Sequence, residues 1–285
     1  MQTKRKKFWI VFTCVFLSLI VLCSVFALVF RLKTVDVEFR AVAENTNLQE
    51  GTIDKVRETG EFDFGKNILF MDFEDNIQKI EKSNPYIKVE QIVRHFPNIV
   101  RVYISERIPK YRVKENSESV SKWYILDNDF KILDKVTEEE LESKKVCGNS
   151  NYFDQTIEIT KQTMTLESEA VIGEFVADET REYLARITSG IYGKTKDFTV
   201  IRSIDYSKVN ETFTLTMRNE ALAEQKGCVI KITGTNNLYD KALAGAVCFV
   251  DGQIVDDTLE RIENIPSVTV SIYEDADGDY YAIAS

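Results

Sequence analysis

An uncharged apolar run near the N-terminus constrains this chain more than any other feature. The run covers residues 8–30, FWIVFTCVFLSLIVLCSVFALVF, directly after a basic segment at 4–7. As a helix it is about 34 Å long, which is enough to cross the hydrocarbon core of a bilayer. A cleavable signal peptide is the alternative, but its apolar part usually has only about 7–15 residues and ends at small residues. Bulky residues close this run, so we predict an uncleaved transmembrane helix.

The charges around the run predict its orientation. Four basic residues at 4–7 precede it, whereas Arg31 and Lys33 follow it. Basic residues are enriched on the cytoplasmic side of a membrane span. We therefore predict a cytoplasmic tail at 1–7, a single span at 8–30 and an extracytoplasmic remainder.

The outer part of the chain is unevenly acidic. Residues 111–285 contain 19 basic and 32 acidic residues, a net charge of −13. This charge would repel nucleic acid and anionic lipid, so neither is an expected partner of this half. Three cysteines lie outside the span, at Cys147, Cys228 and Cys248, and none forms a CxxC pair. We expect isolated buried thiols, with a Cys228–Cys248 disulfide as the alternative.

Residues 34–109 have the pattern of a compact unit. TVDVEFRAV at 34–42 alternates apolar and polar side chains, as a half-buried strand does, and two helical segments follow, the second with Asp72 as its N-cap. Asn84-Pro85 ends that helix, and two strands follow, joined by a turn at Pro97-Asn98. The predicted order is β-α-α-β-β, with the core filled by Val100, Val102 and Ile104 of the last strand.

Residues 110–285 predict a second unit, so the fold class is α+β. The expected elements are short strands with a hairpin turn at Asn128-Asp129, a helix capped by Thr137 and a helix at 178–193 ending at Gly193. Three consecutive strands follow, then a helix whose expected apolar face is Leu238, Leu243, Val247 and Val250, and finally two short strands. We predict a mostly antiparallel β domain with flanking helices and a short C-terminal tail.

No catalytic constellation stands out in the sequence. His95, the single histidine, lies at a strand end without a serine or cysteine at a motif-like spacing. Adjacent residues on a strand point to opposite faces, so sequence neighbours make poor catalytic dyads. This argument applies to the three Ser-Lys pairs, Ser121-Lys122, Ser143-Lys144 and Ser207-Lys208. We predict no catalytic residue, no cofactor and no enzyme activity.

The segment DADGD near the C-terminus is the best candidate for a metal site. Asp275, Asp277 and Asp279 alternate as the first ligands of a calcium loop do, but Gly278 stands at position four instead of six. Position twelve of such a loop would fall beyond Ser285. We therefore predict a hairpin turn and no metal site.

The order of short motifs resembles the bacterial cell-division protein family FtsQ, called DivIB in Gram-positive bacteria. GKNILFMD, NPYIKVEQIVRHFPNIVRVYISERIP and WYILDNDFKIL are similar to its motifs, although the family usually has glycine where Phe130 stands. VIRSID, TFTLTMRN and CVIKITGTNNLYDKALAGA resemble its later strands and a helix that carries a lysine, here Lys241. The matching positions in the first outer unit are Gly65, Asn67, Pro85, Val93, Pro97, Val102, Ile104, Glu106, Arg107 and Pro109.

The resemblance implies a fold and a role. Residues 34–109 would be a POTRA domain and 110–285 a β domain, with Glu106, Arg107 and Pro109 as the hinge between them. The protein would be a non-enzymatic scaffold at the division septum that binds FtsB/DivIC-type and FtsL-type proteins and helps regulate septal peptidoglycan synthases. A partner strand would add to the last strand of the β domain, next to the segment that holds two tyrosines. The implied binding residues are Val268, Thr269, Val270, Ser271, Ile272, Tyr273, Tyr280 and Tyr281.

Two other hypotheses compete with a division scaffold. One is a membrane-anchored POTRA module that binds or chaperones exported polypeptides, which the single span without a barrel disfavours. The other is an envelope hydrolase, which the missing catalytic set disfavours. Outside the span the chain also lacks the long heptads that a coiled-coil partner of the FtsB or FtsL kind would need.

Overall fold

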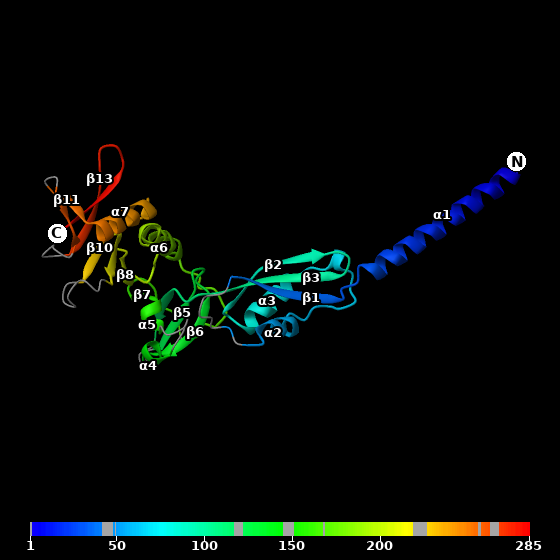
Figure 1. Cartoon of the computed structure of the whole chain (residues 1–285), viewed down its shortest axis with the longest axis horizontal. Coiled ribbons are helices and arrows are strands. Elements are labelled where there is room, and N and C mark those ends of the chain that lie inside the picture. The colour runs from blue at the N-terminus through cyan, green and yellow to red at the C-terminus, as the bar shows by residue number, and fades with distance from the viewer. Residues whose placement is uncertain are drawn as a thin grey trace. The chain divides into compact units, whose positions relative to one another are not determined.

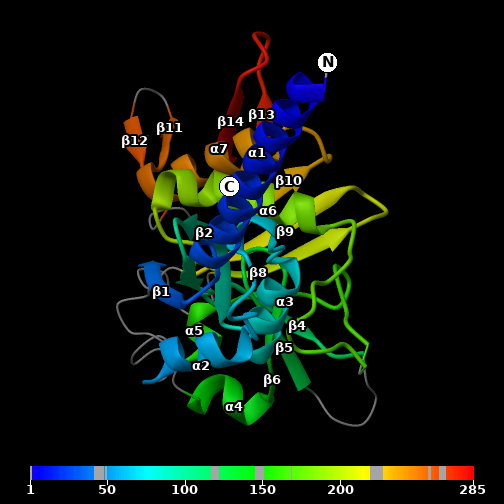
Figure 2. The same cartoon turned by 90° about the vertical axis from the view of Figure 1, so that its right-hand side faces the viewer.

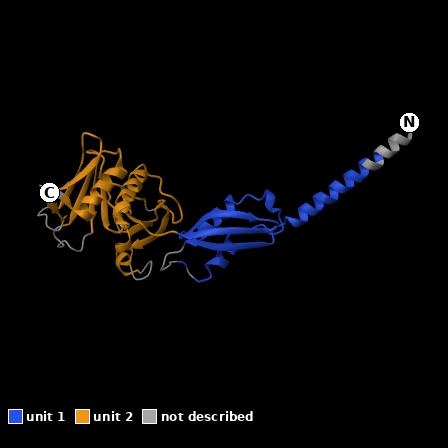
Figure 3. Cartoon of the chain, turned by 45° about the horizontal axis from the view of Figure 1, so that its top comes forward, with its two compact units in different colours: residues 1–106 blue, residues 107–285 orange. Residues whose placement is uncertain are grey.

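The computed structural model describes residues 2–41, 48, 50–116, 122–144, 151–167, 169–218, 227–255, 258–262 and 268–285. The chain divides into two compact units, residues 1–106 and residues 107–285 (Figure 3). Each unit has its own hydrophobic core.

The N-terminal helix α1 extends over Gln2–Val29. Its segment Phe12–Val29 is long and apolar enough to cross a membrane, and none of that segment is buried against the rest of the protein. This feature is consistent with a single-pass anchor.

The rest of unit 1 has the predicted order of elements. Its strands are β1 (Thr34–Ala41), β2 (Ile87–His95) and β3 (Ile99–Glu106), and its helices are α2 (Thr52–Thr59), the 3-10 turn η1 (Ile68–Phe70) and α3 (Glu74–Ser83). The sheet order is β1-β3-β2, with β1 parallel and β2 antiparallel to β3. Sequence-distant β1 and β3 therefore pair directly, and the predicted β-α-α-β-β order is confirmed.

The core of unit 1 lies between this sheet and its helices. Val100, Val102 and Ile104 of β3 are fully buried, as predicted, together with Val56 of α2 and Ile80 of α3. The start of α3 differs from the prediction by one residue, because the N-cap is Phe73. The carboxylate of Asp72 still accepts the backbone N–H of Glu74 at 3.2 Å, so it satisfies a donor of the first turn.

Unit 2 is built on a mixed sheet. Its nine described strands have the order β14-β13-β10-β9-β8-β7-β4-β5-β6, with five antiparallel and three parallel neighbours (Figures 1 and 2). The strands are β4 (Tyr111–Lys114), β5 (Lys122–Leu126), β6 (Ile132–Thr137), β7 (Ile157–Ile159), β8 (Ile201–Ser207), β9 (Thr212–Met217), β10 (Cys228–Thr233), β13 (Thr269–Glu274) and β14 (Tyr280–Ala284). A separate hairpin pairs β11 (Gln253–Val255) with β12 (Thr258–Glu260).

Helices cover the sheet of unit 2 unequally. On one face α6 (Arg181–Thr195) and α7 (Leu238–Asp251) pack into the main core. A smaller cluster around Trp123 and Ile125 contains residues of α4 (Glu138–Ser143) and α5 (Tyr152–Gln155). Thr137 caps α4 in a reciprocal capping box with Glu140, as predicted. α6 ends two residues later than predicted, because Gly193 continues the helix.

The face of α7 that packs into the core was predicted wrongly. Only Leu238 of the four expected residues is fully buried, whereas Val247 and Val250 are exposed and Leu243 is partly exposed. Most of the buried residues of α7 are small, because α7 lies close to its neighbours. A Cβ on Gly245 would lie 2.7 Å from Ile230, and a Cβ on Gly190 of α6 would lie 2.4 Å from the carbonyl oxygen of Tyr239.

The β5–β6 turn explains how phenylalanine replaces glycine there. Phe130 has a φ of 62°, in the left-handed region that glycine favours. Its ring is buried and stacks on Tyr111 with centroids 4.7 Å apart. The packing of the ring therefore offsets the strain of the backbone.

The two described cysteines of unit 2 are free thiols. Cys228 and Cys248 are both buried. Burial raises the pKa of the Cys228 thiol to about 12 and also raises the pKa of Cys248. The structure therefore favours isolated thiols over the disulfide, and Cys147 lies outside the described residues.

Candidate partner-binding edge

The predicted partner strand is not at the edge of the sheet. Val268–Tyr273 corresponds to β13 with the residue before it, and β13 is paired on both sides, with β10 in parallel and β14 antiparallel. The expectation of an open edge at these residues is wrong, because the chain turns back after Glu274 and adds one more strand. That strand, β14, contains the other two predicted residues, Tyr280 and Tyr281.

The outer edge of β14 has a short open segment. Thr269 and Ser285 exchange both backbone hydrogen bonds at 3.0 Å, so alternate residues of β14 direct their N–H and C=O groups away from β13. These residues are Tyr280, Ala282 and Ala284. Within the described part of the chain, the outward backbone groups of Tyr280 and Ala282 have no hydrogen-bond partner.

Side chains fix both ends of β14. The amide of Gln253 accepts the N–H of Ala284 at 2.8 Å and donates to its carbonyl oxygen at 3.0 Å. Gln253 therefore bonds both outward backbone groups of Ala284, as a neighbouring strand would. At the other end, the amide of Asn237 donates to the hydroxyl oxygen of Tyr280 at 2.9 Å, and the Lys241 ammonium lies 5.5 Å from the Tyr280 ring centre. No sequence pattern identifies Gln253 or Asn237 as contributors to this edge.

An exposed apolar residue of α7, Val247, lies beside this open edge. A groove of about 1320 Å³ runs between α7 and β14, lined on the helix side by Leu243, Ala244 and Val247 and on the strand side by residues 279–283. Ala282 faces the core on the helix side of the sheet. A strand added to β14 would extend the sheet beneath these helix residues, so the groove would cover one face of the added strand.

The opposite face of the terminal hairpin is also apolar. Tyr273 and Tyr281 stack with ring centroids 5.7 Å apart, and both are exposed together with Ile283. Stacked aromatic rings on an edge hairpin supply contact area at a low cost in side-chain entropy. Both faces of an added strand would therefore meet apolar side chains.

The tip of the hairpin is acidic and forms the predicted turn. The carboxylate of Asp275 accepts the backbone N–H groups of Asp277 at 3.0 Å and Asp279 at 2.9 Å. Gly278 takes a φ of 86° there. Asp275 is thus engaged with the backbone as in an Asx turn, and among the described residues no group of three His, Cys, Asp or Glu side chains could hold a metal ion.

The predicted hinge residues lie where the two compact units meet in sequence. Unit 1 ends at Glu106 and unit 2 begins at Arg107. The buried guanidinium of Arg107 pairs with Asp127 at 2.5 Å and with Asp129 at 3.3 Å. Arg107 is therefore held within unit 2 by the β5–β6 turn, and a hinge at Glu106, Arg107 and Pro109 stays a prediction.

Burial of Lys110 is expected to make the stability of unit 2 depend on pH. Its ammonium is buried beside the ring of Tyr111 and donates to the Asn128 side-chain oxygen at 2.6 Å. Burial lowers its pKa from 10.5 to about 8, against the opposing effect of Asp129. Between pH 8 and pH 10.5 the Lys110 side chain binds more protons in the unfolded chain than in the folded chain. The free energy of unfolding therefore rises with pH over this range. We expect a gain of about 2 kcal/mol from pH 8 to pH 10.

The measurement is urea unfolding across this pH range, with Lys110→Met as the control. The gain should be missing from the variant, so the difference between the two proteins isolates Lys110 from other titrating groups. Parallel pH profiles for the two proteins would show that Lys110 keeps an ordinary pKa.

The other candidates from the sequence belong to elements other than β13 and β14. His95 is the last residue of β2. The hydroxyl of Ser143 donates to the Glu139 carbonyl oxygen, while Lys144 pairs with Asp134 at 2.5 Å. Lys208 pairs with Glu179 at 2.8 Å, and Ser121 lies outside the described residues. None of these described pairs is arranged as a nucleophile and its base.

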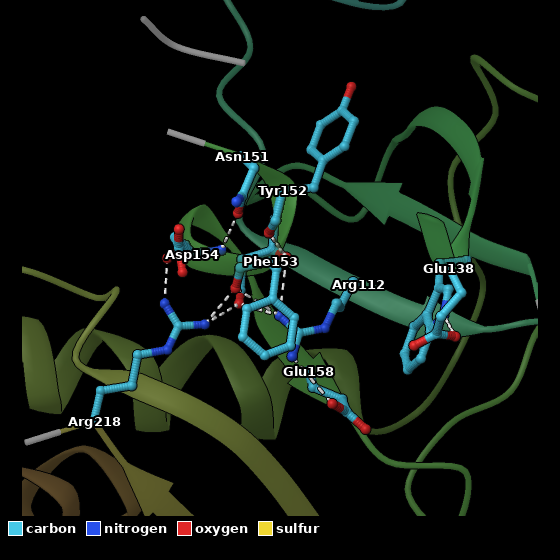
Figure 4. Close-up of polar contacts among 10 residues, drawn as sticks. Arg112, Glu138, Asn151, Tyr152, Phe153, Asp154, Glu158 and Arg218 are labelled. Carbon is cyan, nitrogen blue, oxygen red and sulfur yellow. Dashed lines mark hydrogen bonds and ion pairs between the residues drawn. The ribbon is translucent and has the colours of Figure 1, made fainter. Parts of the chain in front are cut away.

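A buried arginine cluster holds α5 against the sheet (Figure 4). Arg112 of β4 donates to the carbonyl oxygens of Phe153 at 3.1 Å and Thr156 at 2.7 Å, and pairs with Glu158 at 3.0 Å. Arg218 donates to the same two carbonyls at 2.5 and 3.1 Å. Burial lowers the pKa of both guanidinium groups. All these acceptors belong to the end of α5 and to β7, so the cluster has a structural role.

Comparison with known proteins connects this fold to bacterial cell division. A family model described as POTRA domain, FtsQ-type, matches residues 41–107. The fold of unit 1 and this match define an FtsQ-type POTRA domain within this chain. The chain is also 30% identical over 118 residues to cell division protein DivIB of Clostridium tetani (strain Massachusetts / E88), which covers 41% of this chain and 42% of that protein. It is therefore a distant homologue of DivIB, and the similarity spans less than half the length of that relative.

Proposed function

We propose that this protein is a membrane-anchored, non-enzymatic scaffold of the cell-division machinery that captures a partner strand at the outer edge of β14. α1 would be the anchor, with residues 1–7 in the cytoplasm and residues 34–285 outside. The partners would be division proteins of the FtsB/DivIC and FtsL types, and their assembly would help to regulate septal peptidoglycan synthases. The homology to DivIB supports the role in division.

The observation that carries the binding mode is the open edge together with its apolar cover. Tyr280 and Ala282 leave two pairs of backbone groups for an added strand. Such groups give an incoming strand affinity and register, whereas side-chain pockets give selectivity. Val247 of α7 is exposed and lines the groove beside β14, so a strand added to β14 would bury its side chain.

The charges near the edge indicate the chemistry of the partner. Glu274, Asp275, Asp277 and Asp279 surround the tip of the hairpin, and Asp240 lines the groove. The partner strand should therefore alternate apolar side chains and carry lysine or arginine where it passes the tip. Electrostatic attraction of this kind mainly raises the association rate and weakens as salt is added.

The test is a calorimetric titration of the full chain in lipid nanodiscs with the outer domain of the FtsB/DivIC-type protein of the same organism. We expect saturable binding that weakens with salt, and a tagged protein that gathers at mid-cell in growing cells. Absence of binding at low salt would refute the proposed partner. Binding of unfolded exported polypeptides, with a uniform envelope signal, would instead support the chaperone-like POTRA module.

A further inference from the structure

The chain that leaves α1 is joined by backbone hydrogen bonds to two loops of the POTRA domain. The N–H of Leu32 donates to the Lys66 carbonyl oxygen at 2.8 Å, and the N–H of Ile68 donates to that of Phe30 at 2.8 Å. The N–H of Lys33 donates to the Asn98 carbonyl oxygen at 2.9 Å. α1 ends at Val29. The loops at 62–70 and 96–98 are therefore bonded to the residues that directly follow the apolar helix.

These two loops carry large apolar side chains that the fold leaves in contact with solvent. Phe70 is 86% exposed, Phe64 62% and Phe96 59%, and Leu69 is exposed as well. Elsewhere in the described residues 30–106, Phe39 is the one other exposed large apolar side chain. The exposed apolar surface of the POTRA domain is therefore concentrated at the end that α1 enters.

Aromatic contacts continue from the helix into this surface. The rings of Phe26 and Phe30 stack with centroids 5.3 Å apart, and Phe30 meets Phe96 edge to face at 5.7 Å. Basic residues Arg31, Lys33 and Lys66 are exposed around them, with Lys66 paired to Asp63. Aromatic rings bordered by basic side chains suit the boundary between acyl chains and lipid headgroups.

We propose that Phe64, Leu69, Phe70 and Phe96 form a membrane-resting surface, with which the POTRA domain sits on the outer leaflet of the bilayer that α1 spans. The occupant is lipid because the surface is continuous with the end of the span. This inference rests on the proposed anchor, and the contact would hold the POTRA domain against the bilayer at a fixed height.

The test uses spin labels on the full chain in vesicles of phosphatidylcholine and phosphatidylglycerol. Native cysteines are removed as Cys14→Ala, Cys23→Ala and Cys147→Ser, while Cys228 and Cys248 are buried and are left in place. Single labels at Lys66→Cys, Phe16→Cys and Ala41→Cys report on the surface, the span and the far end of β1, which lies about 25 Å along the strand from its start. Collision with oxygen, which concentrates in lipid, is compared with collision with a water-soluble nickel complex.

We expect the label at position 66 to collide with oxygen more than the label at 41 does, and with nickel less. In the variant with Phe64→Ser, Phe70→Ser and Phe96→Ser, the label at position 66 should collide with oxygen and with nickel as often as the label at position 41 does. The circular dichroism spectrum of this variant should be unchanged. A lipid-like signal at 16 with a water-like signal at 66 would overturn the membrane-resting surface and leave the anchor intact. A water-like signal at 16 would overturn both.

Discussion

Replacement of Ala282 by proline is expected to abolish partner binding while unit 2 stays folded. The N–H of Ala282 points away from β13, so its loss removes no hydrogen bond of the sheet. Proline is tolerated on edge strands when the missing N–H faces outward. Its ring would block the open segment, and the affinity for the partner strand should fall about tenfold or more.

Two neighbouring variants separate binding from folding. Ala282→Val keeps the outward N–H and should bind within about a factor of three of the natural chain. Ile283→Pro removes an N–H that faces β13 and should destabilise the terminal hairpin. The measurements are calorimetric affinity and urea unfolding. Full affinity in Ala282→Pro would show that the partner binds elsewhere, with the POTRA domain as the next candidate.

Substitution of Arg112 by methionine is expected to cause the largest loss of stability. The guanidinium is fully buried and donates to Phe153, Thr156 and Glu158. Methionine fills much of the space but donates nothing. Arg218 still bonds the two carbonyls and Glu158 is partly open to water, so we expect the free energy of unfolding to fall by about 3 kcal/mol.

The matched control is Arg202→Met on β8, which is separated from β4 by β7 in the sheet. Arg202 is exposed, and its charge disfavours the charged form of Arg112, so its loss should change stability by less than about 0.5 kcal/mol. Urea unfolding followed by the fluorescence of buried Trp123 measures both variants. Equal stabilities of Arg112→Met and the natural chain would mean that the cluster contributes nothing to holding α5.

Much of the candidate site could not be predicted from the sequence, because its parts come from distant segments. Tyr280 and Tyr281 were predicted from a family resemblance, yet the strand assigned to the edge was β13. The hairpin that leads into β14 was predicted from the local turn residues. The parallel pairing of β10 with β13, and therefore the position of β14 at the edge of the sheet, has no local pattern. Gln253 bonds Ala284, which lies 31 positions away in the sequence, so no local motif predicts this contact.

In helix α7 the secondary structure could be predicted from the sequence, but the buried face could not. The sequence predicts a helix, and the face with larger side chains, which includes Val247 and Val250, was expected to be buried. In the structure most of the buried residues of α7 are small, because Gly190 and Gly245 allow α7 to lie close to α6 and to Ile230. Val247 is exposed beside the open edge, where the proposed partner strand would cover it.

Features that depend on near neighbours along the chain could be predicted. These are the apolar helix, the β-α-α-β-β order of the POTRA domain, the buried face of β3, the cap at Thr137 and the Asp275–Asp279 turn. The identity of the edge strand, the buried face of α7 and the polar side chains at the ends of β14 depend on contacts between distant segments. Periodicity shows that a face must be covered, whereas long-range packing decides what covers it.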